Sequence, residues 1–331
     1  MTQTTVEMPS GIHRLRKAGH PLVGPVLVVL IGLSIFLYPA VATQWNNIKQ
    51  MRVAAEYSKL EEAVAPEVIN QALEDARYYN AHHTNGPILD PWLARVTPDN
   101  TEYHTYLEQL NQQPAMGRVI IPSQRIDLPI YHGTTPEALQ RGAGHLFGSD
   151  LPVGGDSTRT VITGHSGLAN ATLFDNLKGV HAGDPIYIVA AGQKLKYVID
   201  QLQVVLPTEP GNLRPVPGED LLTLITCTPY GINTHRLLVT AHRVPLDEVK
   251  EQAAFETRGP AVQWWMWWVL AAGILVIIAL VWWVVSMLRT YKKREQLRIP
   301  VEDLIPVTDF GIDLSAGPRT RRSAPDRKEH R

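Results

Sequence analysis

Two long stretches without a charged residue constrain this chain more than any other feature of its sequence. Neither Gly19–Ile48 nor Gly259–Leu288 contains Lys, Arg, Asp or Glu. Their apolar centres are each long enough to cross a hydrocarbon layer of ~30 Å, because a helix rises about 1.5 Å per residue. We therefore expect two transmembrane helices, at 22–43 and 263–288.

The composition of both stretches supports this interpretation. Six of the eight tryptophans lie in the second stretch and gather toward its two ends, where interfacial rings are common. The first stretch follows Arg14, Arg16 and Lys17, as the core of a signal peptide would. It is longer than such a core, and no small-x-small cleavage site follows it closely. We expect an uncleaved anchor, with a cleaved signal peptide as the alternative.

Basic residues indicate the orientation of the two spans. They precede the first span at 13–17 and follow the second at 289–298. Since basic flanks tend to stay inside, we expect a cytoplasmic N-terminus at 1–21 and a basic cytoplasmic tail at 289–331. The region between the spans would then lie outside the plasma membrane.

Net charge and cysteine content limit what the exported region can do. The formal net charge is −1, so there is no strong positive field with which to bind nucleic acid. The single cysteine, Cys227, excludes an intramolecular disulfide, which is the usual use of cysteine outside the cell. Cys227 is then either a buried inert thiol or a reactive one. His82-His83 lacks a spaced third ligand, so we expect no metal and no cofactor.

The exported region begins with a helical segment at 44–111. Helical patterns cover Gln44–Ala63, Glu67–Tyr79 and Asp99–Leu110. Pro66 stands at a favourable first-turn position of the second pattern. Residues 82–98 mix turn residues with isolated apolar ones and have no period. We expect a stalk or cap on the domain that follows.

From Gly117 on, short runs of β-forming residues alternate with Gly, Pro and Asn. The runs are Arg118–Ile121, Asp127–Tyr131, Thr160–Thr163, Pro185–Ala190, Lys194–Val205, Leu221–Cys227 and Arg236–Arg243. Such spacing predicts a mainly β domain, a sandwich or barrel, at 112–245. Short helices are expected at Thr135-Pro136-Glu137 and Ala169–Leu177. A linker at 246–262 leads to the second span.

Cys227 and Arg236 are expected to lie close together at one rim of this domain. Cys227 ends a strand pattern that Thr228-Pro229-Tyr230-Gly231 interrupts, so its thiol stands at a strand end. Arg236 opens the next strand pattern after an eight-residue loop. If the two strands pair as an antiparallel hairpin, the end of one faces the start of the other.

His165 is the third candidate site residue, in a turn with Gly164 before it and Ser166-Gly167 after it. A thiol nucleophile needs a proton partner, and an imidazole that titrates near neutral pH can serve. A fixed guanidinium can stabilise the oxygen that becomes negative in the transition state. His235 is a rival to His165, but successive strand residues point to opposite faces, so it would face away from Arg236.

Together these residues resemble the signature of the sortase family. The resemblance rests on Thr223-Leu224-Ile225-Thr226-Cys227, on Arg236 further on, and on Thr163-Gly164-His165-Ser166-Gly167 upstream, and it extends over Gly117–Arg243. Sortases are cysteine transpeptidases of Gram-positive cells with an eight-stranded β-barrel. We therefore expect that barrel, with N-terminal helices and two flanking transmembrane helices.

The resemblance also implies a role for each residue. Cys227 would attack the Thr–Gly bond of a C-terminal sorting motif of the Leu-Pro-x-Thr-Gly (LPXTG) type and form a thioacyl-enzyme. His165 would protonate the leaving amine and deprotonate the incoming one, and Arg236 would hold the substrate carbonyl. The implied partners are pilins or other surface proteins as substrates, and a pilin lysine or the peptidoglycan precursor as amine acceptor.

Two features resemble sortases of class C, which polymerise pilins. These have a second membrane span after the barrel and an Asp-Pro-aromatic lid before it, and Asp90-Pro91-Trp92 fits the lid pattern. Asp90 and Trp92 are thus candidate lid residues, although Asp-Pro alone commonly opens an ordinary turn. Pilus assembly is the expected function.

Three alternatives remain open. A housekeeping sortase would transfer proteins to the peptidoglycan precursor instead of to a pilin. A cysteine peptidase or cell-envelope amidase is less consistent with the order of the residues, because papain-like enzymes place Cys before His, whereas His165 precedes Cys227 here. A scaffolding β-domain without activity would leave the lone cysteine unexplained.

Overall fold

The computed structural model of this protein describes residues 22–83, 100–208, 213–256, 259–260 and 262–296. The chain divides into two compact units, residues 1–277 and 278–331. The barrel and the first long helix belong to the first unit. The second unit begins within the long C-terminal helix α6 (Trp264–Gln296).

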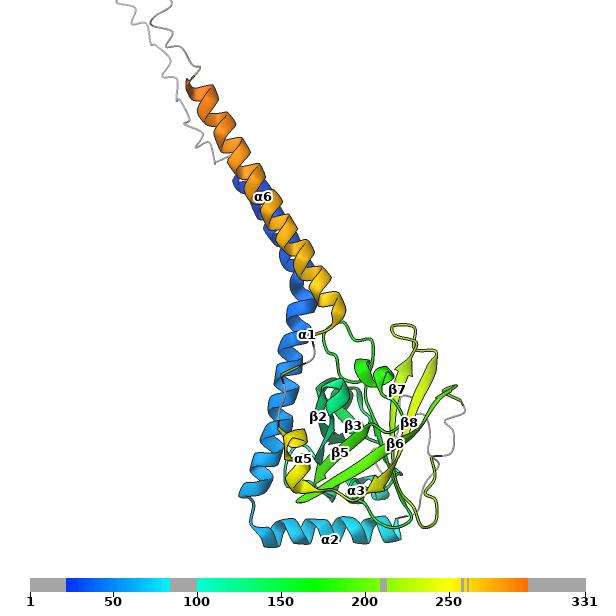
Figure 1. Ribbon diagram of the computed structural model, residues 1–331. Helices are drawn as coiled ribbons and strands as arrows, with labels where there is room; N and C mark the ends of the chain where they lie inside the picture. The colour runs from blue at the N-terminus through cyan, green and yellow to red at the C-terminus, as the bar shows by residue number, and fades with distance from the viewer. Residues whose placement is uncertain (1–21, 84–99, 209–212, 257–258, 261, 297–331) are drawn as a thin grey trace, which may run out of the picture. The chain divides into compact units, whose positions relative to one another are not determined.

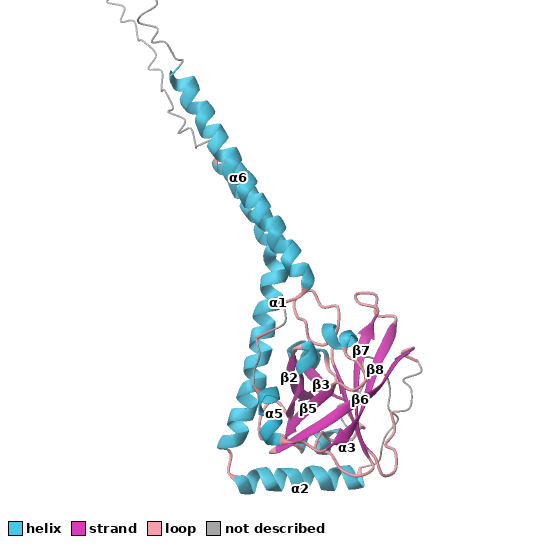
Figure 2. Cartoon of the chain, in the orientation of Figure 1, coloured by secondary structure: helices cyan, strands magenta, loops and turns pink. Residues whose placement is uncertain are grey.

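The β-rich segment forms a closed barrel of eight strands, the magenta arrows of Figure 2. The strands are β1 (Gly117–Ile121), β2 (Ile126–His132), β3 (Ala143–His145), β4 (Thr158–Thr163), β5 (Pro185–Ala190), β6 (Gln193–Val205), β7 (Asp220–Thr228) and β8 (His235–Val244). Around the barrel their order is β1-β2-β3-β4-β7-β8-β6-β5. The predicted eight-stranded barrel with N-terminal helices is confirmed.

Strand β3 is the one that the sequence pattern did not predict. It has three residues and lies between β2, to which it runs parallel, and β4, to which it runs antiparallel. Gly144 allows this close approach, because a Cβ atom there would lie 2.4 Å from the carbonyl oxygen of Gly133. A strand this short, with glycine at its centre, has no alternating pattern to detect.

The parallel pairing of β4 with β7 determines where the candidate site residues lie. Thr158 of β4 is level with Asp220 of β7, and Thr163 is level with Ile225. Since the two strands point the same way, the residues that follow them emerge at the same rim of the barrel. A parallel pair requires a long connection, which the residues between β4 and β7 provide.

Helix α1 (Val23–Ala63) covers part of the outer surface of the barrel (Figure 1, blue). Its last part and α5 (Glu248–Phe255) pack through Tyr57 and Phe255 against Ile120 and other residues of β1, β2 and β5. All five residues of β1 are therefore buried, on both faces. The sequence indicated a membrane span followed by a separate helix, but the two form one continuous helix of 41 residues.

The shorter helices largely begin where the sequence indicated. Pro66 opens α2 (Pro66–His82), and Thr135 caps α4 (Pro136–Arg141) by accepting a hydrogen bond from the backbone N–H of Ala138. Asn100 caps α3 (Thr101–Glu108) in the same way. Helix α5, by contrast, falls in the segment expected to be a linker, and Asp247 caps it by accepting from the backbone N–H of Lys250.

The helix expected at Ala169–Leu177 is wrong. Residues 169–174 form turns, and only a 3-10 helix, η2 (Asp175–Gly179), follows them. The physical reason is that α1 takes the backbone groups that a helix would use. The N–H of Thr172 donates to Asn47, and the carbonyl oxygens of Ala169 and Asn170 accept from side chains of α1.

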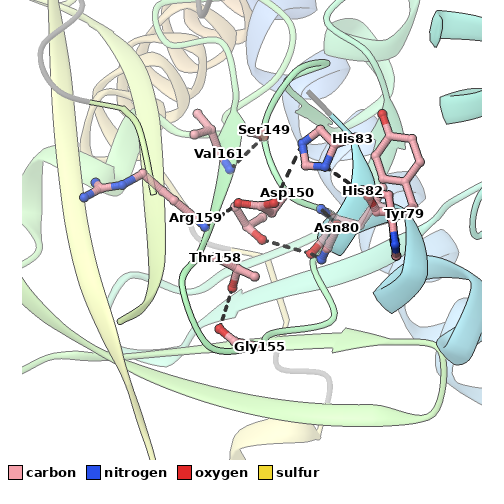
Figure 3. Close-up of polar contacts among 12 residues, drawn as sticks. Tyr79, Asn80, His82, His83, Ser149, Asp150, Gly155, Thr158, Arg159 and Val161 are labelled. Atoms are coloured by element: carbon pink, nitrogen blue, oxygen red, sulfur yellow. Dashed lines mark hydrogen bonds and ion pairs between the residues drawn. The ribbon is translucent and has the colours of Figure 1, made fainter. Parts of the chain in front are cut away.

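Helix α2 is fastened to the connection between β3 and β4 by paired hydrogen bonds (Figure 3). Asn80 exchanges two of them with the backbone of Leu151, at 2.8 and 3.2 Å. Nε2 of His83 lies 3.7 Å from a carboxylate oxygen of the buried Asp150. The other carboxylate oxygen of Asp150 accepts from the backbone N–H of Arg159, at 2.7 Å. The helical segment is therefore built into the domain.

Helix α3 is held through Tyr106, which is fully buried. Nε2 of His145 lies 2.8 Å from the carbonyl oxygen of Asp150, which can only accept, so this nitrogen carries the proton. Nδ1 of His145 is then free to accept from the Tyr106 hydroxyl at 3.0 Å, and that hydroxyl accepts from the N–H of Gly133 at 2.9 Å. Burial lowers the pKa of His145 to about 3, which keeps its ring neutral.

Replacing Tyr106 by Phe should destabilise the domain, because it removes one hydroxyl and leaves two buried polar groups without that partner. The cost should be about 1–3 kcal/mol, or several degrees in Tm. Thermal unfolding of the full chain in detergent measures this. Tyr78→Phe is the matched control, since the side chain of Tyr78 is 67 % exposed. Equal Tm values for the two variants would contradict the expected role of the Tyr106 hydroxyl.

Candidate active site

Cys227 and Arg236 lie directly opposite each other on β7 and β8. The two strands pair antiparallel as the sequence indicated, and their register sets Cys227 against Arg236. Cys227 is 9 % exposed and Arg236 is 7 % exposed, so both lie at the edge of the barrel interior. On one face of a sheet, directly opposed side chains are near neighbours.

His165 follows the end of β4 and comes level with Cys227. Thr163, the last residue of β4, pairs with Ile225, so His165 and Cys227 each lie two residues beyond this pair in the same direction. Hydrogen bonds beyond the ladder keep the two segments together. The Ser166 hydroxyl donates to the carbonyl oxygen of Cys227 at 2.6 Å, and the N–H of Gly164 donates to Ile225 at 3.1 Å. The three predicted site residues thus gather at the ends of three adjacent strands.

The glycines beside His165 allow the loop to lie close to its neighbours. A Cβ atom at Gly164 would lie 2.8 Å from the ring of Phe174, which is completely buried. Gly167 has a φ of +78°, and a Cβ atom there would lie 2.9 Å from the backbone nitrogen of Gly231. Both positions therefore exclude larger residues, which gives the Gly-His-Ser-Gly pattern a structural cause.

Arg236 is anchored at the base of the loop between β7 and β8. Its Nη1 donates to the carbonyl oxygens of Asn233 and His235, at 3.1 and 3.2 Å. A guanidinium has five N–H donors and stays charged at any physiological pH. His235 pairs with Thr228, one position beyond the Cys227–Arg236 pair, so it is not the residue opposite the thiol.

His165 is half-buried, and this burial lowers its pKa below the ordinary value for histidine. A lowered pKa favours the neutral imidazole near pH 7, which can accept a proton. The rim thus combines a thiol, a neutral imidazole and a permanent cation. This combination can support nucleophilic attack, proton transfer and stabilisation of an oxyanion.

Asp175 supports the His165 loop and was not predicted as a site residue. It is 5 % exposed, and its carboxylate accepts from the N–H of Gly167 at 2.7 Å. The carbonyl oxygen of His165 accepts from the N–H of Phe174, the neighbour of Asp175, at 3.0 Å. No spacing in the sequence indicates these contacts, since an aspartate in a turn is ordinary. The predicted lid residues Asp90 and Trp92 lie outside the described residues.

The barrel topology and the cysteine-centred rim define a class of protein, and comparisons with known proteins agree with it. Residues 119–244 match the family model described as "Sortase domain". Over 152 residues the chain is 28% identical to sortase A of Streptococcus agalactiae serotype III (strain NEM316), covering 45% of this chain and 58% of that protein. It is 26% identical over 135 residues to sortase A of Bacillus anthracis, covering 41% and 62%. It therefore spans less than two thirds of these relatives.

Several solved structures have a higher sequence identity to this chain than these two proteins have. Sortase C-1 of Actinomyces oris has 52% sequence identity and a TM-score of 0.53, with 54% of this chain and 99% of that chain covered. Sortase A of Corynebacterium diphtheriae has 52% identity and a TM-score of 0.54, with 62% and 97% covered. A sortase C of Streptococcus pneumoniae has 37% identity and a TM-score of 0.54, with 59% and 97% covered. The chain belongs to the sortase family, as the resemblance in its sequence predicted.

Asp175 should make the stability of the protein depend on pH. Burial raises its pKa to about 6, above the ordinary value near 3.8, so the folded state favours the protonated carboxyl. The stabilisation by this proton is complete below about pH 4 and is lost as the pH rises through about 6. Asp175→Asn stays neutral and can still accept from Gly167, so its Tm should rise relative to that of the wild type between about pH 4 and about pH 7.

Thermal unfolding of the full chain in detergent across this pH range measures the difference. The matched control is Asp156→Asn, at an exposed position. A Tm difference between Asp175→Asn and the wild type that stays constant with pH would show that the carboxyl does not titrate in this way.

Proposed function

We propose that this protein is a membrane-anchored cysteine transpeptidase that cleaves a sorting motif of the Leu-Pro-x-Thr-Gly type and transfers the cleaved protein to an amine. The observation that supports this most directly is the strand register that sets Cys227 opposite Arg236 and level with His165. On the barrel of a family of transpeptidases, such a set has the parts that acyl transfer needs.

In the proposed reaction, His165 takes the proton of the Cys227 thiol, and the resulting thiolate attacks the carbonyl carbon of the motif threonine. Arg236 stabilises the oxygen of the tetrahedral intermediate. The C–N bond to glycine then breaks, and His165 gives its proton to the leaving amine. A thioester remains on Cys227. An incoming amine attacks it, His165 takes a proton from that amine, and the new amide leaves as the thiolate is restored.

A pilin lysine is the proposed acceptor, and pilus assembly the proposed role. Support comes from two similar structures. One, 38% identical, is a pilus-related sortase C of Group B Streptococcus. The other is the sortase C of Streptococcus pneumoniae, whose structure has been described in terms of catalysis and pilin substrate specificity. The second candidate is transfer to the peptidoglycan precursor, which the similarity to two proteins named sortase A favours.

We also propose that α1 and α6 both cross the plasma membrane of a Gram-positive cell. Each is long and apolar enough, with mean hydropathies of 2.4 and 2.7 over their most apolar windows. The basic residues that flank them favour cytoplasmic termini, with the barrel outside the membrane at the cell wall.

Cys227→Ala should abolish the covalent acyl intermediate without unfolding the barrel, because it removes one small side chain at the rim. Arg236→Lys should lower kcat/KM by about a hundredfold or more, since an ammonium lacks the planar fork of the guanidinium. Mass spectrometry of the full chain incubated with a fluorogenic motif peptide detects the acyl intermediate. The rate of peptide cleavage gives kcat/KM. Lys178→Ala is a control for loss of an exposed cation, whose Nζ lies 5.0 Å from the ring centroid of Tyr230 in the loop between β7 and β8. Cleavage by the Cys227→Ala variant would exclude Cys227 as the nucleophile.

The lid that the sequence indicates remains a proposal, supported by a similar solved structure that is a lid mutant of sortase A from Corynebacterium diphtheriae. If Trp92 and Asp90 cover the thiol, an indole gives more free energy of closure than an exposed ion pair, about 1.5–3 against about 0–1 kcal/mol. A bulky thiol reagent should then alkylate Cys227 fastest in Trp92→Ala, more slowly in Asp90→Asn and slowest in the wild type. Equal rates would indicate an ordinary turn at Asp90-Pro91-Trp92.

A further inference from the structure

Helix α1 changes character where its apolar run ends. Its first part is largely exposed, as expected of a surface that faces lipid, and includes Val28 at 69 % and Ile35 at 70 %. From Ala40 onward one side of the helix is buried against the domain, at Ala40, Thr43, Asn47, Gln50, Met51, Ala54, Tyr57 and Glu61. These positions follow the helical repeat, so one continuous helix serves as membrane anchor and then as part of the domain.

The first polar residues of this buried stripe contact the loop that carries His165. Asn47 is 6 % exposed and makes two hydrogen bonds with Thr172. Its Nδ2 donates to the Thr172 hydroxyl at 2.8 Å, and its Oδ1 accepts from the Thr172 N–H at 3.0 Å. Two further bonds lie beside this pair. Thr43 donates to the carbonyl oxygen of Ala169 at 3.2 Å, and Asn46 donates to that of Asn170 at 2.8 Å.

The second anchor reaches the same loop from its own outer end. Gln263 directly precedes α6, and its Nε2 donates to Oδ1 of Asn176 in η2, at 3.0 Å. The two helices also meet, since a Cβ atom at Gly273 would lie 3.2 Å from a methyl group of Leu37. All these residues belong to the first compact unit of the chain.

From these contacts a short series of hydrogen bonds leads to His165. The carbonyl oxygen of Thr172 accepts from the N–H of Asp175 at 2.8 Å, and the Asp175 carboxylate accepts from the N–H of Gly167 at 2.7 Å. Phe174 donates to the carbonyl oxygen of His165 at 3.0 Å. The loop between β4 and η2 is therefore bonded to the anchors on one side and to the catalytic rim on the other.

We propose that Asn47 and Gln263 are positioning residues that hold the His165 loop at the outer ends of the membrane anchors, and so fix the active-site rim at the lipid surface. This inference rests on the proposed function. It implies that the enzyme selects substrates by the distance between the scissile bond and the bilayer. A membrane-embedded polypeptide with the right spacing meets a site already at its level, whereas a motif further out does not.

The position of the loop can be tested without activity. In full chains that carry Cys227→Ala, nitroxide labels are attached at Asn170→Cys or at Ser157→Cys. Both positions are exposed; Ser157 directly precedes β4, and Asn170 lies in the loop that follows β4, a strand that itself spans roughly 20 Å. In phosphatidylglycerol vesicles, collision rates with oxygen and a nickel chelate should place the first label near the lipid phosphates and the second well outside. Equal depths would overturn the proposal.

Turnover tests the positioning role. Substrates that share one motif and one membrane span but differ in the spacer between them are compared in vesicles with a soluble motif peptide. Thr172→Val keeps the shape of the side chain and removes its hydroxyl, while Thr172→Ser keeps the hydroxyl. Three variants should make kcat/KM depend less on spacer length: Thr172→Val, Asn47→Ala and Gln263→Ala. At the best spacer their kcat/KM should fall by up to about tenfold, which corresponds to the free energy of one lost hydrogen bond.

In these variants kcat/KM for the soluble peptide should fall by less than about threefold, which corresponds to less free energy than one hydrogen bond contributes. Thr172→Ser should behave as the wild type, and so should Lys49→Ala, an exposed position on α1. Equal losses of kcat/KM on the soluble and embedded substrates would indicate a general structural role and overturn the proposal. A wild type whose kcat/KM does not depend on spacer length would overturn it as well. If the wild type cleaves no substrate at all while the labels show the expected depths, the proposed function fails and the placement at the lipid surface stands.

Discussion

The site depends on the hydrogen-bond ladder between β4 and β7. Because this pair is parallel, the loop after β4 and the loop after β7 leave the barrel at the same rim, and His165 comes level with Cys227. The antiparallel pairing of β7 with β8 then brings Arg236 opposite the thiol. A shift of one residue in either ladder would turn one of these side chains to the other face of the sheet. The register therefore has to be fixed firmly.

Buried polar contacts around the ladder, together with apolar packing, fix the register of β4 and β7. Thr163 and Thr226 each donate a side-chain hydrogen bond to a carbonyl oxygen of the neighbouring segment, at 3.1 and 2.8 Å. At the other end of β4, Asp150 accepts from the N–H of Arg159. Such bonds are costly to leave unmade when their groups are buried, so alternative registers are disfavoured.

Much of the fold and of the site was predictable because it depends on local patterns. The apolar runs, the seven longer strands and the hairpin from Cys227 to Arg236 each follow from residues that are close in sequence. The strand β3 and the turns at 169–174 were not predictable in this way. The first is too short to show a period, and the second is determined by Asn47, which lies 125 residues away from Thr172 in the chain. The role of Asp175 has no signal in the sequence either, because an aspartate in a turn is ordinary and its contact with Gly167 follows no regular spacing.

The continuity of α1 limits how its length can vary. Each residue inserted into a helix rotates everything beyond it by about 100° and shifts it by about 1.5 Å. One extra residue between the apolar run and Asn47 would therefore turn Leu37 away from Gly273 of α6 while Asn47 stays docked on the barrel domain. An insertion before Val23 would leave the stripe and the run unchanged relative to each other. Variation in the length of α1 is thus tolerable at its N-terminal end and restricted near the barrel.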